Sequence, residues 1–249
     1  MKNLKFISLY LNMKLWIFLF FCCLNCFCQE AIIKNATKFV GVDIYENCYY
    51  LQNDALHKSG LKNDYKNVEY GIPDVVDISN PLQILLLYKF FNKVILLDNQ
   101  LSFITQFEVP IGTELISNAS KDKIWLYDNI NMMIKLYNFK TQKTEISSIP
   151  IKENIVELKG NLNQALVLDS KNQLTKYNFL ARKEDVFNTE NIILPKSLIK
   201  TYYIKERKLY HKNNETLSTP SNIESFEVIN NKLYFFKENN IYALPIPKN

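Results

Sequence analysis

The stretch KVILLDN at residues 93–99 recurs in altered form as IKLYNF at 134–139 and as LTKYNF at 174–179. Val94, Ile134 and Leu174 occupy equivalent positions in these stretches and lie 40 residues apart. A fixed period near 40 residues, in which each unit consists of a few short strands, is typical of a radially repeated β-architecture. The repeat therefore predicts an all-β fold.

An apolar partner precedes each copy of this stretch. The partners are QILLLYK at 83–89, KIWLYDN at 123–129 and QALVLDS at 164–170. Reading such runs in order groups the strands of the chain into six units. The second, third and fourth units each have four strands, and the last two are shorter. KLYHKNN at 208 and KLYFFKENN at 232 show that the repeat continues in contracted form. Asparagine fills many of the turns between runs, because its side chain tolerates the left-handed backbone conformation.

The first 28 residues have the composition of a secretory signal peptide. They contain three lysines and no acidic residue, followed by the apolar run LWIFLFFCCL. Cys26 and Cys28 are small residues at the positions expected before cleavage, which predicts a mature chain that starts at Gln29 and has no transmembrane segment. Met13 begins a compact n-region of its own and is an alternative start. A lipoprotein and an uncleaved membrane anchor are the rival interpretations. The apolar run is shorter than the ~20 residues that span a bilayer, which disfavours the anchor.

Removal of residues 1–28 changes the charge balance and the cysteine count. The whole chain has 30 Lys and Arg against 25 Asp and Glu; without three lysines this becomes 27 against 25, a net charge of +2. No basic run of the kind that binds phosphates remains, which excludes nucleic acid as the expected partner. Only Cys48 remains of five cysteines, so no internal disulfide forms, and we expect Cys48 to be buried.

The six units resemble a β-propeller of the secreted bacterial kind, over residues 31–247. The resemblance implies a single domain at 29–249 with six short blades; five blades and an open β-sandwich are the alternatives. The chain lacks the Gly-His and Trp-Asp pairs of WD repeats and the Asn-His-Leu signature of NHL repeats, so no particular propeller family is indicated. EAIIKN at 30–35 is apolar enough to be a strand but belongs to no unit. Because open sheet edges are avoided, we expect it to pair with the last unit near 232–245 and close the ring.

The oxygen-bearing side chains of the first strand in each unit are the candidate site. In a propeller these strands line the central channel. GVDIYEN at 41–47 and VVDISNP at 75–81 place Asp43 and Asp77 at equivalent positions, with Asn118 and Glu157 in later units. Converging oxygens of this kind could hold a calcium ion, as in propellers that resemble lactonases. The alternative, which we favour, is that both aspartates bond neighbouring backbone amides and fix turns.

Two functions follow from the sequence. The first is a non-catalytic binding or scaffold protein of the cell envelope, exported to the periplasm or outside the cell, monomeric, and acting on an unidentified protein or envelope component. It needs no cofactor. The second is a metal-assisted hydrolase or lactonase-like propeller with an ion in its channel. No Gly-rich phosphate loop, HExxH or GxSxG motif occurs, and the chain has only two histidines, His57 and His211. These absences favour the binding protein.

Overall fold

The computed structural model describes residues 30–189, 192–195, 202–212 and 214–247. The chain divides into a unit of residues 1–31 and a unit of residues 32–249, and every strand of the described residues belongs to the second unit. The expected cleavage site at Cys28 and Gln29 lies outside the described residues. In the part of the chain that is described, no helix is long and apolar enough to cross a membrane.

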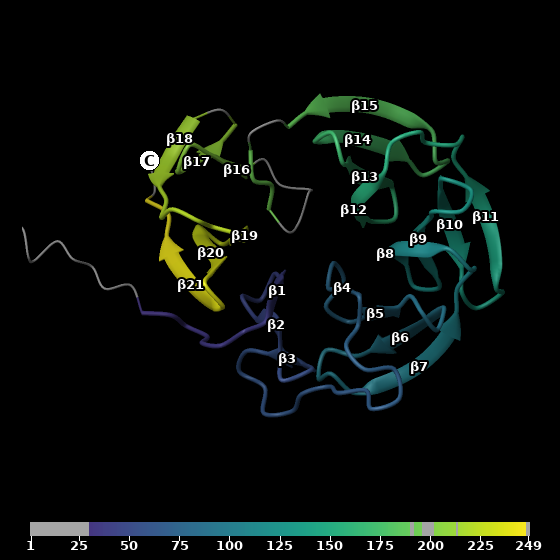
Figure 1. Ribbon diagram of the computed structural model, residues 1–249, viewed down its shortest axis with the longest axis horizontal. Helices are drawn as coiled ribbons and strands as arrows, with labels where there is room; N and C mark the ends of the chain where they lie inside the picture. The colour runs from purple at the N-terminus through teal and green to yellow at the C-terminus, as the bar shows by residue number, and fades with distance from the viewer. Residues whose placement is uncertain (1–29, 190–191, 196–201, 213, 248–249) are drawn as a thin grey trace, which may run out of the picture. The chain divides into compact units, whose positions relative to one another are not determined.

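Six antiparallel sheets, here called blades 1 to 6, follow one another around a ring (Figure 1). In every blade each strand pairs with the next one in the chain, and the first strand lies nearest the centre. The strands are β1 (Lys38–Val42), β2 (Cys48–Gln52) and β3 (Ala55–Lys58) in blade 1; β4 (Val75–Asp77), β5 (Ile84–Tyr88), β6 (Lys93–Leu97) and β7 (Phe103–Glu108) in blade 2; β8 (Thr113–Ser120), β9 (Lys123–Asp128), β10 (Met133–Asn138) and β11 (Lys143–Ser147) in blade 3; β12 (Ile155–Gly160), β13 (Gln164–Asp169), β14 (Gln173–Asn178) and β15 (Lys183–Asn188) in blade 4; β16 (Tyr202–Lys205), β17 (Lys208–His211) and β18 (Asn214–Ser218) in blade 5; and β19 (Ser225–Ile229), β20 (Lys232–Lys237) and β21 (Asn240–Pro245) in blade 6. The predicted all-β propeller is confirmed.

The 40-residue period is the spacing between corresponding strands of blades 2 to 4. β6, β10 and β14 begin at residues 93, 133 and 173. The repeated Asp after the second strand has a structural cause. The Asp169 carboxylate accepts the backbone N–H groups of Lys171 and Gln173 at 2.8 and 2.9 Å, and so fixes the turn between β13 and β14. Asp128 does the same for the turn between β9 and β10. Turn chemistry thus explains part of the repeat.

The inner strands of blade 2 are buried on both faces, because this blade packs between blades 1 and 3. All five residues of β5 are buried. Ile84 and Leu86 belong to the apolar cluster shared with blade 1, whereas Leu85 and Leu87 belong to the cluster shared with blade 3. A sheet covered on both faces needs continuous apolar runs rather than alternation. This is why the runs in the sequence are unbroken.

Trp125 and Leu126 on β9 follow the same rule. The sequence predicts that one of them lies in the core, and both have an exposed fraction of 0%. Trp125 packs in the cluster between blades 3 and 4, and Leu126 packs in the cluster between blades 2 and 3. The expectation of a single core residue was too narrow, because it assumed a sheet with one solvent-facing side.

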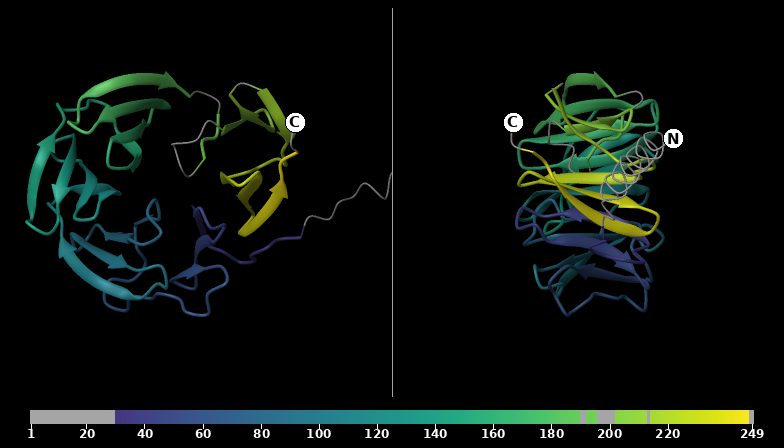
Figure 2. Two further views of the ribbon diagram at one scale, coloured as in Figure 1. Left: turned by 180° about the vertical axis from the view of Figure 1, so that it is seen from behind. Right: turned by 90° about the vertical axis from the view of Figure 1, so that its left-hand side faces the viewer.

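The N-terminal segment closes the ring, as expected. Ile33 pairs with Ile241 of β21 in an antiparallel bridge. The N–H groups of Ile32 and Ile33 donate to the Ile241 carbonyl at 2.9 and 3.3 Å, and the Ile241 N–H donates back to Ile33 at 2.9 Å. Figures 1 and 2 show this segment, in purple, beside the yellow β21. Ala36 and Phe39 continue the seam, because they lie in one apolar cluster with residues of blade 6.

The short blades contain single bridges where a further strand would lie. The apolar and aromatic residues around KNVEY, at 66–70, predict a fourth strand in blade 1. Tyr65, just before that stretch, bridges Leu56 of β3, so this strand is reduced to one pair. In blade 5, Ile193 bridges Ile204 on the inner side of β16. The sequence contains no sign of this inner bridge, because one paired residue produces no periodic pattern.

Candidate functional site

Two of the channel residues predicted from the sequence, Asp77 and Asn118, lie together, and Asp77 is the last residue of β4. Its side chain has no exposed surface. The hydroxyl of Ser79 and the backbone and side-chain amides of Asn118 donate to one carboxylate oxygen at 2.7, 2.8 and 3.0 Å. The Ser117 hydroxyl and the Lys159 ammonium lie 3.3 and 3.4 Å from the other oxygen. Five donors therefore surround this carboxylate.

These bonds join three blades at the centre of the ring. Asp77 belongs to blade 2, Asn118 to blade 3 and Lys159 to blade 4. Burial alone lowers the pKa of the Lys159 ammonium, but the carboxylates of Asp77, Glu157 and Glu227 outweigh it and hold that pKa above the ordinary value. Lys159 is therefore charged. A buried pair of this kind fixes the relative placement of the strands that carry it, and removing one partner leaves an uncompensated charge.

Asp43 has a different environment, although it occupies the equivalent position after β1. Its carboxylate accepts the N–H groups of Tyr45 and Asn47 at 2.9 and 3.0 Å and the Tyr49 hydroxyl at 3.1 Å. The Asn47 side-chain amide also donates to it. All these partners belong to blade 1. Asp43 thus fixes the turn between β1 and β2, and no described bond joins it to Asp77.

Glu157 lies on β12, two residues before Lys159, and is half-buried. It lines a cavity of about 320 Å³ in the channel, together with Lys38, Asp74 and Lys89. The sequence-predicted residues therefore divide into three places: a saturated buried pair of Asp77 and Asn118, a turn at Asp43, and a channel cavity at Glu157. Across the described ranges, no group of three or more His, Cys, Asp and Glu side chains is placed to hold a metal ion.

The nucleophilic and imidazole side chains are held in structural contacts. Cys48 is 1% exposed, as predicted, and burial, with a smaller effect of the Asp43 charge, raises the pKa of its thiol to about 12. A thiol that stays protonated at neutral pH is a poor nucleophile. His57 stacks on Tyr50 with ring centroids 5.2 Å apart, and His211 stacks on a tyrosine of β16 at 4.4 Å.

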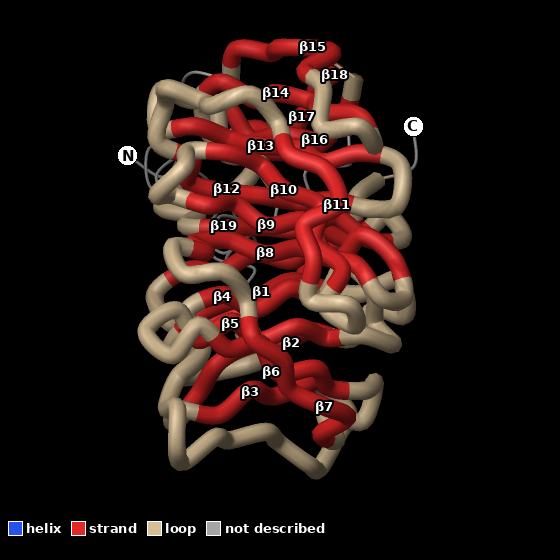
Figure 3. Tube along the Cα trace, turned by 90° about the vertical axis from the view of Figure 1, so that its right-hand side faces the viewer, coloured by secondary structure: helices blue, strands red, loops and turns tan. Residues whose placement is uncertain are grey.

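A second candidate site, which the sequence did not reveal, lies on one side of the ring. The strands run between two opposite sides, where the loops gather (Figure 3). Because strand direction alternates, the loops between the second and third strands of a blade lie on the same side as the connections between blades. Within blades 2 and 3 these loops are residues 89–92, 109–112, 129–132 and 148–154. We call this side the connection face.

An aromatic group stands on the connection face over blade 2. Phe90 is 89% exposed and contacts Phe91 edge-on, with ring centroids 5.1 Å apart. Phe91 packs against Tyr70 at 4.8 Å, and Tyr70 packs against the buried Tyr88 at 5.4 Å. Tyr88, Tyr70 and Phe91 thus form a packed base beneath the exposed ring of Phe90. Aromatic rings held in this way are the usual anchors of protein interfaces.

Aliphatic side chains extend this surface over blade 3. Ile111, Ile130, Met132 and Ile149 are 73%, 65%, 44% and 79% exposed. Their loops are joined by backbone hydrogen bonds, from Asn129 to Gly112 at 2.8 Å and from Ile151 to Met132 at 2.7 Å. We call the seven side chains together the apolar face: Tyr70, Phe90, Phe91, Ile111, Ile130, Met132 and Ile149.

The sequence does carry a sign of the apolar face. Turns and loops normally hold polar residues or glycine, whereas FF at 90–91 and single isoleucines at 111 and 130 lie in turns and Ile149 lies in a loop. Each is ordinary by itself, because isolated exposed apolar residues are common. Only the alternation of strand direction shows that these turns share one side, so the grouping required the blade assignment.

Comparison with known proteins reveals likeness in structure only. No protein-family model matches the chain, and no curated protein matches its sequence. Among solved structures, virginiamycin B lyase from Staphylococcus aureus superposes with a TM-score of 0.54 at 11% identity, covering 84% of this chain and 79% of the lyase. A streptogramin B lyase superposes with a TM-score of 0.54 at 12% identity, covering 88% and 96%. The WD40 propeller domain of Doa1 gives 0.54 at 10% identity, covering 82% and 76%.

These likenesses establish the β-propeller architecture. At such low identity they say nothing of activity, because one fold carries many functions. The function of this chain depends on the chemistry of its own two sites.

Proposed function

We propose that this protein is a non-catalytic binding or scaffold protein of the cell envelope, and that it docks a protein partner on its apolar face. The observation that carries the proposal is the grouping of seven apolar side chains on one side of blades 2 and 3. Contiguous exposed apolar surface on a folded domain is typical of an interaction site. Phe90 is the central anchor, because it is both the most exposed of the seven and supported from beneath by Phe91 and Tyr70.

The chemistry of the channel supports a binding role over a catalytic one. The alternative function, a metal-assisted hydrolase or lactonase-like propeller, depends on oxygens of Asp43, Asp77, Asn118 and Glu157 converging on an ion. The carboxylates of Asp43 and Asp77 instead accept hydrogen bonds from donors within reach, and those donors would have to be displaced. A carboxylate whose oxygens already accept several hydrogen bonds is poorly suited to bind a metal ion.

Capture from envelope extract tests the docking surface. Tagged protein and three variants, Phe90→Asp, Ile130→Asp and Leu162→Asp, are compared for the proteins that they retain. Leu162 is the matched control, because it is 66% exposed in the loop between β12 and β13 on the opposite side of the ring. We expect a partner that the parent and Leu162→Asp retain and that both apolar-face variants lose. Equal retention by all four proteins would contradict the apolar face as the docking surface.

Metal analysis of the purified protein tests the alternative. The binding proposal expects no stoichiometric ion. An ion present at one equivalent in the parent and absent from Asp77→Asn would instead favour the hydrolase, since the Asp77 carboxylate contacts residues of two neighbouring blades. Circular dichroism of Asp77→Asn distinguishes loss of an ion from loss of the fold.

Export is a further part of the proposal and rests on the composition of residues 1–28. We expect the exported form to begin at Gln29 or within a few residues of it, in the periplasm or outside the cell. Intact-mass measurement of exported protein checks this. A mass that retains residues 13–28 would instead indicate a membrane anchor, and an added lipid mass would indicate a lipoprotein.

A further inference from the structure

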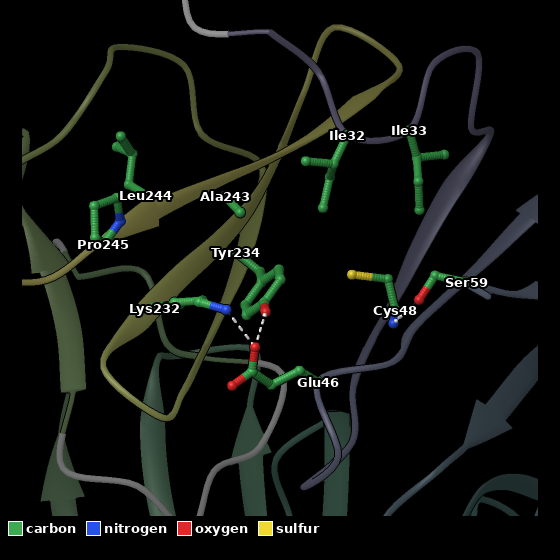
Figure 4. Close-up of a pocket in the computed structure, with 10 residues that line it drawn as sticks. All are labelled: Ile32, Ile33, Glu46, Cys48, Ser59, Lys232, Tyr234, Ala243, Leu244 and Pro245. Atoms are coloured by element: carbon green, nitrogen blue, oxygen red, sulfur yellow. Dashed lines mark hydrogen bonds and ion pairs between the residues drawn. The ribbon is translucent and has the colours of Figure 1, made fainter.

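A pocket of about 500 Å³ lies at the seam where the ring closes, away from the channel and the apolar face. Its walls come from the N-terminal segment, from blade 1, and from β20 and β21 of blade 6. Six of its side chains are apolar: Ile32, Ile33, Cys48, Ala243, Leu244 and Pro245. The volume falls within the ~300–1,000 Å³ of pockets that hold small molecules. Figure 4 shows the two isoleucines above the space and Ala243 behind it, while the Cys48 sulfur points into it.

The walls behave as an apolar surface. Burial is the main cause that raises the pKa values of the Cys48 thiol and the Tyr234 hydroxyl, so both groups are neutral across the physiological range. Cys48 is 1% exposed, and a neutral thiol packs like a small hydrophobic group. Ile32, by contrast, is 50% exposed, although it contributes to the wall. An apolar molecule in the pocket would cover that surface.

One polar group of the pocket is an ion pair at its edge. The Lys232 ammonium donates to a carboxylate oxygen of Glu46 at 2.5 Å, and the Tyr234 hydroxyl donates to the same oxygen at 3.2 Å (Figure 4). The Asn230 side chain donates to the other oxygen at 3.1 Å. The hydrogen bond from Lys232 is the largest of the causes that lower the pKa of Glu46, so this carboxylate is ionised at neutral pH.

This pair selects the head group of a ligand. A charged head group would lie beside both Glu46 and Lys232, so an ammonium or a carboxylate meets one opposite and one like charge and gains little attraction for the hydration that it loses. An ammonium ion has three N–H donors, and the Glu46 bond uses one of those on Lys232. A neutral acceptor, such as an ester or amide carbonyl, could take another without any repulsion.

We propose that the seam pocket binds a medium-length acyl chain whose carbonyl belongs to an uncharged ester or amide. The chain lies among Ile32, Ile33 and Ala243, and the carbonyl accepts from Lys232. Because the pocket spans blade 6, blade 1 and the segment that closes the ring, occupancy also stabilises closure. A ligand that binds only the folded state raises the melting temperature as its concentration rises above Kd.

Displacement of a fluorescent probe tests the site. The full chain is titrated with N-phenyl-1-naphthylamine, an uncharged apolar probe, and the probe is then displaced by methyl octanoate, octanoate or octylamine, which share one chain length. We expect methyl octanoate to displace the probe at about three- to tenfold lower concentration than either charged compound, the range of a single modest polar contact. It should also raise the melting temperature.

Variants locate the binding. Ala243→Leu fills the pocket, since Ala243 lies opposite Tyr234 in the β20–β21 pairing, and should weaken probe binding about tenfold or more. Ile32→Ser removes apolar wall at an exposed position and serves if Ala243→Leu does not fold. Lys232→Met should abolish the preference for the ester while the probe still binds. Lys123→Met, which breaks a similar exposed pair with Glu145, is its matched control and should behave as the parent.

The apolar face is the competing location for such a probe. Phe90→Asp should leave probe affinity unchanged, so failure of the docking proposal and failure of this one give different results. Unchanged probe affinity in both Ala243→Leu and Ile32→Ser would overturn the assignment to the seam pocket. Equal displacement by the three octyl compounds would overturn the assignment of the carbonyl to Lys232.

Discussion

Replacement of Gly160 by alanine tests how tightly blades 3 and 4 pack. Gly160 is the last residue of β12, and an ideal Cβ built on it would lie 2.4 Å from Cδ1 and 3.1 Å from Nε1 of Trp125. The indole has no room to move, because it is 0% exposed and its N–H donates to the Asn161 carbonyl at 2.9 Å. Gly160 does not have a positive φ, so the alanine meets no backbone strain and the effect is steric.

The magnitude follows from two costs. Overpacking a filled core typically costs ~1–3 kcal/mol. If the indole moves enough to lose its bond to the Asn161 carbonyl, the unsatisfied buried groups cost about 1–3 kcal/mol more. The two costs together give an expected loss of about 2–6 kcal/mol in the free energy of unfolding. At ~2–4 °C per kcal/mol for a domain of this size, the melting temperature should fall by about 4–24 °C.

Thermal unfolding followed by circular dichroism measures the effect. Gly60→Ala is the matched control, because its Cβ would meet nothing within 4 Å and only its φ of +77° is strained. That strain costs about 1–2 kcal/mol, less than the expected clash. Trp125→Ala removes the atoms that the new methyl group meets, so Gly160→Ala should be nearly neutral in that background. A penalty of the same size in both backgrounds, or a melting temperature within about 2 °C of the parent, would refute the steric explanation.

Three further changes probe other parts of the ring. Trp125→Ala by itself should cost about 3–5 kcal/mol in chemical denaturation, the usual cost of truncating a buried large aromatic residue, and a change below about 1 kcal/mol would contradict its core position. Deleting residues 29–36 should lower the melting temperature and promote aggregation, because it removes the segment that pairs with β21 and exposes the edge of that strand. Light scattering measures the aggregation. An unchanged melting temperature and no added scattering would show that closure contributes little to stability. Burial raises the pKa of the Tyr177 hydroxyl to about 12, so the unfolded state ionises at lower pH than the folded state and stability falls between about pH 10 and 12. Tyr177→Phe should reduce this loss of stability. Identical alkaline melting curves of parent and variant would show that Tyr177 does not contribute to it.

The architecture was predictable from the sequence because the blades are built from a repeated local pattern. Strand, turn and strand recur at fixed spacing, and the Asp and Asn residues that end the strands fix the same turns in successive blades. Closure by the N-terminal segment was also predictable, since an apolar strand without a unit and a last unit with three strands complement each other. Asn53 and Asn172, expected in turns, have positive φ values of 52° and 60°. In these cases local chemistry and global fold agree.

The candidate site was much less predictable, because its members are related by contacts between blades. Asp43 and Asp77 look equivalent in sequence. Asn47 supplies donors to Asp43 from the same turn, whereas the donors to Asp77 come largely from Ser117 and Asn118 of the neighbouring blade. No pattern in the sequence indicates which blade provides the hydrogen-bond donors to each of these carboxylates. Lys159 was missed for the same reason, since a lone lysine in a strand has no distinguishing spacing.

The distribution of constraint in the ring explains where a functional surface can lie. Positions on the strands serve the packing between blades, and the charged groups at the centre serve mutual hydrogen bonds, so both sets are committed to holding the ring together. The turns at residues 89–92 and 129–132 have no such role, because their backbone N–H groups already donate to the carboxylates of Asp74 and Asp128. Phe90 and Ile130 stand in those turns, where an apolar side chain contributes little to folding and costs solubility. A side chain that the fold does not require, grouped with others of its kind on one side, is most simply explained by a partner that covers it.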